Sequence, residues 1–491
     1  MIEKIRKIFT NTSLKSRVLK GGFWLGLGGS FEYGLRFLRN IILARILAPE
    51  AFGLMAIILA VNAALESFTQ IGIKEAIIQS PDGEEDSYLN GAWWLSFVRA
   101  IGLFAIAMLS VPFIASFYNV PQNTIMFRIS FFTILFNGTL SARAYIAQKK
   151  MDYKPWVIIS SGGGTIGILA AIGLSLWLHS VWALVIGYVL EAAARCFISF
   201  IVCPFLPRLQ FRKEHSQALI TFSRGMFGLP ILLFVFTQAD IFVVGKLLSK
   251  KELGLYSMAL SLAQLPIFLV STIINPILMP VFSEKQHDKD WINRTLMLST
   301  RIIVLAGTPV ACFMALYGRN LLTIIYGHEY VSVAIPFAIL LGSTILRAAS
   351  NPIANVYLAV GQPQLQRYFT GIRAVLMTLM IYPAVKLFGL TGAASAGLIA
   401  MIFGYIVQIV RVQAVTNLDT VKYGMIFLHG LLLSLLVIIV WSVAHQTASA
   451  PLHDILIGLI SCVALYGIVG VVTRRFKQHV CLTRLQWRLR G

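Results

Sequence analysis

The chain has 491 residues, of which 57% are hydrophobic and only 12% are charged, and its mean hydropathy is +0.78. A soluble domain carries about a quarter charged residues, so the soluble classes are excluded, because too few charges remain to cover a water-facing surface. A net charge of +21 would suggest nucleic-acid binding in a soluble chain, but in a membrane protein much of it belongs to cytoplasmic loops. The composition therefore predicts an all-α polytopic membrane protein.

Fourteen apolar segments are long enough to cross a bilayer. In chain order they cover 21–45, 52–71, 92–117, 126–147, 155–178, 180–205, 218–245, 253–281, 296–317, 332–358, 368–387, 390–410, 423–444 and 454–473. We expect two six-helix bundles and two further helices, divided into a basic N-terminus (1–20), a first bundle (21–207), a linker (208–217), a second bundle (218–411), two extra helices (422–473) and a basic tail (474–491).

Lysine and arginine residues outside these spans fall unequally on the two sides. The termini and the even-numbered loops hold 25 of them, whereas the odd-numbered loops hold six. Positively charged residues are enriched in cytoplasmic loops. The distribution therefore predicts that both termini lie in the cytoplasm.

With Arg45 and Lys386, at the ends of their spans, counted among the six of the odd-numbered loops, ten positive residues remain within the spans, and all are arginine. An arginine facing lipid at the centre of a helix costs about 2.5–3.5 kcal/mol, so they cannot all face lipid. Five lie near a cytoplasmic end, where we expect them to reach the headgroups: Arg99, Arg143, Arg224, Arg301 and Arg373. Four lie deeper, where we expect an interior cavity: Arg36, Arg39, Arg195 and Arg347; the tenth is Arg128. The spans hold only four acids, which are Glu32, Glu66, Glu191 and Asp240.

Glu32, Arg36 and Arg39 lie at positions i, i+4 and i+7 of the first span, on one helical face. Glu32 can compensate Arg36 and leave Arg39 for a ligand, or the acid and Arg36 can form a buried ion pair that ties the first span to a neighbour. Glu191 and Arg195 repeat the i, i+4 spacing in the sixth span. The sequence alone leaves both interpretations open.

Asp240 and Glu66 have no opposite charge three or four residues away. They must find partners on other helices or titrate, so both are candidate sites for coupling to a proton or another cation. The glycines Gly162–Gly164 follow no strand, which favours close helix packing over a phosphate-binding loop. The sequence contains no Ser/His/Asp set and no His/Cys cluster, so we expect no enzyme, no metal and no cofactor.

Arginine at depth also suits a particular class of ligand. A guanidinium stays charged when desolvated, and its planar fork binds phosphate oxygens in a bidentate manner. A short repeat supports a transporter built from two related bundles. Arg45 and Gly53-Leu54 recur as Lys246 and Gly254-Leu255, at a constant offset of 201 residues.

These features, with the runs LARILAPEAFGL (Leu43–Leu54), GIKEAIIQ (Gly72–Gln79) and NPIAN (Asn351–Asn355), resemble the polysaccharide transporter family of the multidrug/oligosaccharidyl-lipid/polysaccharide exporter superfamily. The similarity is greatest to the branch of colanic acid and exopolysaccharide exporters. It implies a multi-pass protein of the bacterial inner membrane that moves undecaprenyl-diphosphate-linked oligosaccharides to the periplasmic leaflet by alternating access. It further implies coupling to a proton or sodium gradient and, as partners, the lipid-linked substrate, membrane lipids and a polymerase of the same pathway.

Two alternative functions remain. A multidrug exporter of the same superfamily would carry cations, which the surplus of arginine over acid disfavours. A membrane polysaccharide polymerase usually has a sizeable extracytoplasmic loop, and no expected outer loop exceeds about 15 residues. On residue type and depth, the candidate substrate-binding residues are Arg36, Arg39, Arg195, Arg347 and Glu32, and the candidate coupling residues are Asp240 and Glu66.

Overall fold

The computed structural model describes residues 14–69, 72–209, 229–268, 287–447 and 455–460, together with Leu219, Leu278 and Phe282. Within these residues the secondary structure is helical, without strands. Nine of the described helices are long and apolar enough to cross a membrane, or ten if one bent pair counts as a span. The predicted all-α polytopic membrane fold is therefore confirmed. Most of the last expected span, 454–473, lies outside the described residues, as do parts of 218–245 and 253–281.

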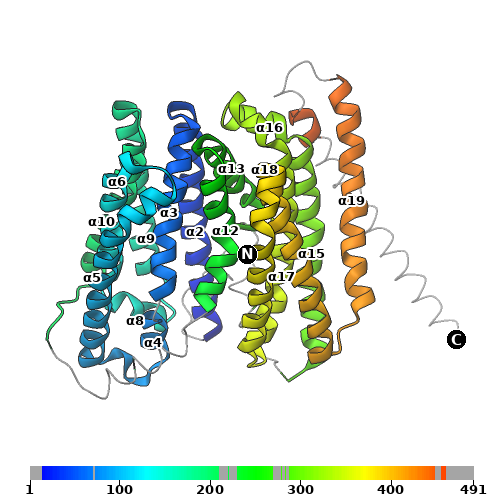
Figure 1. Ribbon diagram of the computed structural model, residues 1–491. Coiled ribbons are helices and arrows are strands. Elements are labelled where there is room, and N and C mark those ends of the chain that lie inside the picture. The colour runs from blue at the N-terminus through cyan, green and yellow to red at the C-terminus, as the bar shows by residue number, and fades with distance from the viewer. Residues whose placement is uncertain are drawn as a thin grey trace.

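We refer to residues 14–209 as the N half, which lies on the left of Figure 1. Its helices are α2 (Leu14–Ile46), α3 (Pro49–Thr69), α4 (Ile73–Gln79), α5 (Asp86–Phe117), α6 (Thr124–Ser130), α7 (Phe132–Gly138), α8 (Arg143–Lys149), α9 (Lys154–Leu178) and α10 (Val181–Val202), with short 3-10 turns η1 (Pro81–Glu84) and η2 (Pro121–Asn123). Helix α9 packs between α10 and α2, and this three-helix contact positions the charged residues described below.

The predicted span 126–147 is not one straight helix. The chain bends by 59° between α7 and α8. Two polar contacts support the break: the Trp93 indole N–H donates to the carbonyl of Thr139 at 3.3 Å, and the backbone N–H of Ser141 donates to the Ser199 hydroxyl at 3.0 Å. Backbone groups that leave the helical ladder must find other partners when buried, and here neighbouring helices supply them.

We refer to residues 229–447 as the C half, on the right of Figure 1. Its helices are α12 (Leu229–Leu247), α13 (Lys250–Ala263), α15 (Lys289–Leu316), α16 (Gly318–Ile325), α17 (Ala334–Ala359), α18 (Pro363–Thr416) and α19 (Thr420–Thr447), with the 3-10 turn η3 (His328–Val333) before α17. Helix α19 lies at the edge, against α15.

Helix α18 contains the two spans predicted at 368–387 and 390–410. A non-helical residue, Gly389, interrupts it with a φ of 56°, in the left-handed region that glycine adopts without strain. Beyond this point the two arms run antiparallel, because Gly392 lies against the backbone of Ala384 and Gly404 lies against the side chain of Arg373. Gly389 therefore separates two helices, as the sequence predicted.

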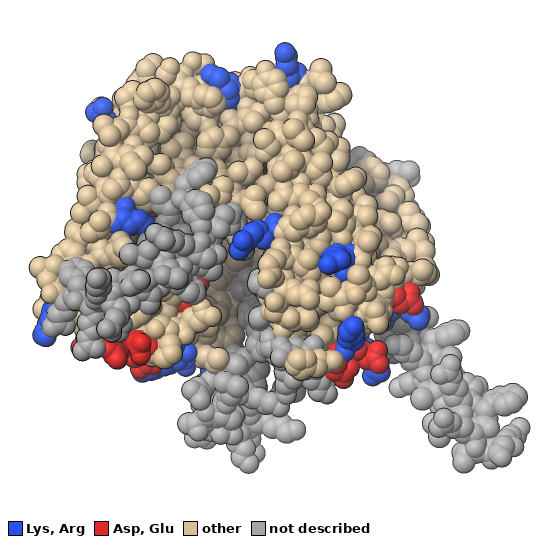
Figure 2. All heavy atoms as spheres, turned by 60° about the horizontal axis from the view of Figure 1, so that its bottom comes forward, with Lys and Arg blue, Asp and Glu red and all other residues tan. Residues whose placement is uncertain are grey.

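The surface shows the same division between lipid and water that the composition implies. Figure 2 shows a surface that is mostly uncharged; its acidic side chains gather toward one end together with basic ones, and further basic side chains lie at the opposite rim and between the two. Large apolar side chains on the flank are exposed, among them Phe113, Trp177 and Leu387. The largest apolar core joins the two halves, and it includes Ile57 and Ile58 of α3 with Leu253 and Tyr256 of α13.

Candidate functional site: two charged cavities between the halves

Glycines in α9 position the first group of charged residues. A Cβ at Gly163 would meet the backbone of Arg195, and one at Gly167 would meet that of Glu191. Helix α10 can approach α9 this closely only because these positions lack side chains. A Cβ at Gly164 would lie 3.5 Å from the Glu32 side chain on α2. The prediction that the glycines of this segment serve close helix packing is confirmed.

The close packing brings two predicted i, i+4 pairs together into one cluster of four charges, which we call the quartet. Arg36 pairs with Glu32 at 3.0 Å and also with Glu191. Arg195 pairs with Glu32 at 2.9 Å and with Glu191 at 2.7 Å, and the Ser160 hydroxyl also donates to Glu32. Two positive and two negative charges balance, so the quartet is neutral and ties α2 to α10.

Arg39 lies one turn beyond the quartet and has a different environment. Its guanidinium donates to the Asn40 side-chain oxygen through Nε at 3.2 Å and Nη2 at 3.0 Å. The Asn40 amide in turn donates to the Ser261 hydroxyl of α13 at 3.2 Å. In the described part of the chain, no carboxylate forms a salt bridge with Arg39. Its charge is therefore held by neutral groups.

Arg36 and Arg39 line a cavity of about 240 Å³ between α2 and α13. A second cavity of about 320 Å³ lies mainly within the C half and is bordered by α12, α13, α17 and α18. Both cavities are lined by Tyr33, Leu260 and Gln264, so the two adjoin. Together they place charged residues of both halves around one central space.

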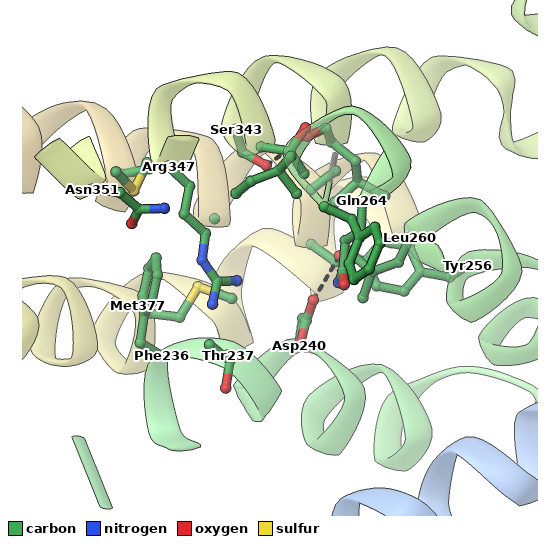
Figure 3. A pocket seen from close by; sticks show the side chains of 18 of the residues that line it. Phe236, Thr237, Asp240, Tyr256, Leu260, Gln264, Ser343, Arg347, Asn351 and Met377 are labelled. Carbon is green, nitrogen blue, oxygen red and sulfur yellow. Dashed lines mark hydrogen bonds between the residues drawn. The ribbon is translucent and has the colours of Figure 1, made fainter. Parts of the chain in front are cut away.

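Arg347 and Asp240 both project into the second cavity (Figure 3). Asp240 accepts a hydrogen bond from the Tyr256 hydroxyl at 2.9 Å and one from the backbone N–H of Ile241 at 2.9 Å. Among the described residues, none forms a hydrogen bond or salt bridge with the Arg347 guanidinium. The cavity thus presents an acid that is held by neutral donors and an arginine that faces open space.

The other sequence candidates lie away from this space. Arg195 lines neither cavity and contacts both acids of the quartet. Glu66 also lies outside both cavities; its carboxylate accepts a hydrogen bond from the Asn137 amide at 3.1 Å, and it interacts electrostatically with Arg99. Glu66 therefore interacts with residues of other helices in the N half, which is one of the two outcomes that the sequence allowed.

Arg373 differs from its expected position. The sequence places it among arginines that reach the headgroups, but its residue surface is only 6% exposed, and its Nη2 donates to the Gln408 side-chain oxygen at 2.7 Å. The reason is the hairpin of α18, where Gly404 leaves space for the Arg373 side chain. Arg143 does lie at an end, where it pairs with Asp86 at 3.2 Å, and Arg224 falls outside the described residues.

Sequence reasoning missed the uncharged polar groups that line and support the cavities. They are Tyr33, Asn40, Ser257, Ser261, Gln264, Ser343 and Gln408. The sequence does contain a signal for them, because amides and hydroxyls inside apolar spans need partners, but charge alone does not reveal these residues.

The fold and the cavities define a polytopic α-helical membrane protein with a charged internal space between two halves, which is an arrangement typical of transporters. The chain belongs to the polysaccharide biosynthesis protein family, whose model matches residues 42–335, and the family resemblance predicted from the sequence is confirmed.

Individual relatives agree with this family. The succinoglycan biosynthesis transport protein ExoT of Rhizobium meliloti (strain 1021) is 26% identical over 72% of each chain. The lipopolysaccharide biosynthesis protein WzxC of Escherichia coli (strain K12) is 21% identical over 81% of this chain and 80% of its own. A solved structure of the lipid II flippase MurJ, in an inward closed conformation, superposes with a TM-score of 0.73 at 15% identity and covers 91% of this chain and 98% of that one. At that identity the structural similarity establishes the fold alone.

Proposed function

We propose that this protein is a flippase that moves a diphosphate-linked lipid oligosaccharide from the cytoplasmic to the periplasmic leaflet of the bacterial inner membrane. The observation that carries the proposal is that two arginines of the adjoining cavities, Arg39 from the N half and Arg347 from the C half, form no salt bridge with a carboxylate of the described residues. In this proposal an anionic group of the cargo binds between the halves, where the two cavities adjoin. Membership of the polysaccharide biosynthesis family and the names of ExoT and WzxC support a polysaccharide precursor as the cargo.

The quartet holds the helices of the site in place, and its balanced charges are not available to the cargo. Arg36 borders the first cavity, but its charge is balanced by Glu32 and Glu191. Arg195 and Glu32 hold α2 against α10 and thereby fix the helix that presents Arg39. We therefore assign Arg39 and Arg347 to the cargo, and Glu32, Arg36 and Arg195 to positioning.

Asp240 is the proposed site of coupling to a proton or sodium ion. It is buried, it lines the cavity, and its partners are neutral donors, so a bound cation or proton would neutralise an otherwise isolated carboxylate. Glu66 is the weaker candidate, because it lies outside both cavities and close to Arg99. Replacing Asp240 with Asn is expected to leave cargo binding in place and remove the gradient dependence of transport in proteoliposomes.

We propose the finer architecture that the sequence predicts. It comprises fourteen spans in two six-helix bundles with two extra C-terminal helices, the boundaries expected from the sequence, and both termini in the cytoplasm. The protein acts without catalysis or a cofactor, and a polymerase of the same pathway uses the delivered lipid-linked units. The charge distribution of the loops supports this orientation.

The test compares cavity arginines with a matched control. In a strain that lacks the native gene, Arg39→Ala and Arg347→Ala are expected to abolish surface polysaccharide and to accumulate lipid-linked precursor, while the protein still inserts into the membrane. The control Arg319→Ala removes an exposed arginine from α16, outside both cavities, and is expected to retain export. Normal polysaccharide from both cavity variants would refute the proposal.

A further inference from the structure

Helices α3 and α13 cross where the repeat of the sequence predicts equivalent positions. A Cβ added to Gly53 would clash with the carbonyl of Lys250, and one added to Gly254 would clash with the carbonyl of Pro49. In both cases it would also lie 3.0 Å from the backbone nitrogen of the opposite glycine. The contact is reciprocal, so the two glycines lie next to an approximate local twofold axis between α3 and α13.

Basic residues flank this crossing and reach from each half into the other. Arg45, at the end of α2, donates from Nη2 to the carbonyl of Thr323 at 3.1 Å and to that of Ile324, in the last turn of α16. Lys246, at the end of α12, donates from Nζ to the carbonyl of Phe117 at 2.6 Å, at the end of α5. The last carbonyls of a helix lack intrahelical partners, and a cation is favourable there.

The two donors occupy equivalent positions of the sequence repeat, although their acceptors, Thr323 and Ile324 of α16 and Phe117 of α5, do not. Arg45 and Lys246 are separated by the same 201 residues as Gly53 and Gly254. Each residue ends the first helix of its half and binds the C-terminal carbonyls of a helix in the opposite half. Lys250 adds a weaker contact of the same kind, 3.4 Å from the carbonyl of Asn119. We call Arg45 and Lys246 the paired latches.

The position of these contacts matters for access to the cavities. Helix α16, whose last carbonyls accept hydrogen bonds from Arg45, lies at the upper end of Figure 1, whereas α4 and α8 lie at the opposite end. The first cavity begins close to these contacts. Its lining residue Asn40 precedes Arg45 by five residues on α2, and its lining residue Ser257 follows Gly254 by three residues on α13. Separation of α3 from α13 at the glycines would therefore expose that cavity from this end.

We propose that the Gly53–Gly254 crossing and the paired latches form the closure of the cavity at the face carrying the odd-numbered loops, and that Arg45 and Lys246 together determine how often it opens. Backbone contact at the glycines lets the helices part without disengaging interlocked side chains. The latches are hydrogen bonds from charged donors at an exposed rim, so they can break and re-form. Assignment of this face to the periplasm rests on the proposed function and its orientation.

The test measures access directly and needs no cargo. In a chain whose five native cysteines are replaced, a reporter Ser257→Cys lines the first cavity, and a membrane-impermeant maleimide is added to intact cells. Arg45→Ala and Lys246→Ala are each expected to raise the labelling rate about tenfold, and the double variant about a hundredfold, as for independent losses of a charged hydrogen bond. Arg319→Ala, an exposed arginine of α16 whose side chain makes no contact of this kind among the described residues, is expected to leave the rate unchanged.

A second pair of variants tests the crossing itself. Gly254→Ala is expected to raise labelling because the added methyl group holds α3 and α13 apart, whereas Gly102→Ala, where a Cβ meets no atom within 4 Å, should not. Parental labelling rates in the double latch variant and in Gly254→Ala, with protein that is monodisperse in detergent, would overturn the inference. Failure of the proposed function would appear separately, as normal glycan export by the Arg39 and Arg347 variants.

Discussion

The neutral quartet gives the most quantitative expectation, because its charges can be removed singly or in balanced pairs. Glu191→Gln deletes one negative charge while keeping the shape of the side chain. It leaves Arg36 and Arg195 to share Glu32 alone, with a net charge of +1 among side chains that lie within the spans. The Glu191 side chain is only 7% exposed, so water can replace the lost carboxylate only in part.

The magnitude follows from the partial burial of the arginines. Removing one partner of a fully buried ion pair costs about 3–5 kcal/mol, but the Arg36 and Arg195 side chains are 32% and 28% exposed, and the glutamine oxygen still accepts a hydrogen bond. We therefore expect a loss of about 2 kcal/mol for Glu191→Gln. The double variant Glu191→Gln/Arg195→Gln restores the balance, because the pair Arg36–Glu32 remains at 3.0 Å.

The assay is thermal unfolding in one detergent, followed by tryptophan fluorescence, for the parent, both single variants and the double variant. Each single variant is expected to melt several degrees below the parent, and the double variant is expected to melt above both single variants. The loss of unfolding free energy in the double variant should be smaller than the sum of the two single losses by about 1 kcal/mol or more. A double variant no more stable than the worse single variant, or a Glu191→Gln protein as stable as the parent, would refute the charge-balance reasoning.

Two further variants test other contacts by the same melting measurement. Gly167→Ala is expected to destabilise the protein by about 1–3 kcal/mol, because the added methyl group overpacks against Glu191 on α10. Gly173→Ala on the same helix, where a Cβ meets nothing within 4 Å, should be neutral or slightly stabilising. Equal melting temperatures of the two variants would contradict the packing role of Gly167. Gln408→Leu leaves the Arg373 guanidinium without its acceptor and is expected to cost about 2 kcal/mol, and an unchanged melting temperature would show that another group holds Arg373.

Composition and hydropathy were sufficient to predict the membrane fold, because burial in lipid is recorded in every span. The hairpin at Gly389 was also predictable, since two apolar segments with a glycine between them exceed the length of one span. The bend between α7 and α8 was not, because it depends on Trp93 and Ser199 of other helices. Hydropathy reports how apolar a segment is and carries no information about which neighbour accepts its backbone groups.

The charged residues show a similar division. The i, i+4 spacing predicted that Glu32 could pair with Arg36 and Glu191 with Arg195, since neighbours on one helical face are fixed by local geometry. That the two pairs would merge depends on the approach of α9 to α2 and α10, which is a tertiary property. Arg373 was misplaced for the same reason, because its distance from the end of its own helix said nothing about Gln408 on the returning arm.

The structure also changes what the surplus of intramembrane arginine means. The predicted spans contain ten arginines and four acids, but the charges of two arginines and two acids balance within the quartet. The free charge at the cavities is carried by Arg39 in one half and Arg347 in the other. An anion bound by both would contact the two halves at once, so cargo charge and the relative position of the halves are physically linked. A cargo without that anion would engage only one half at a time and would not favour the closed arrangement.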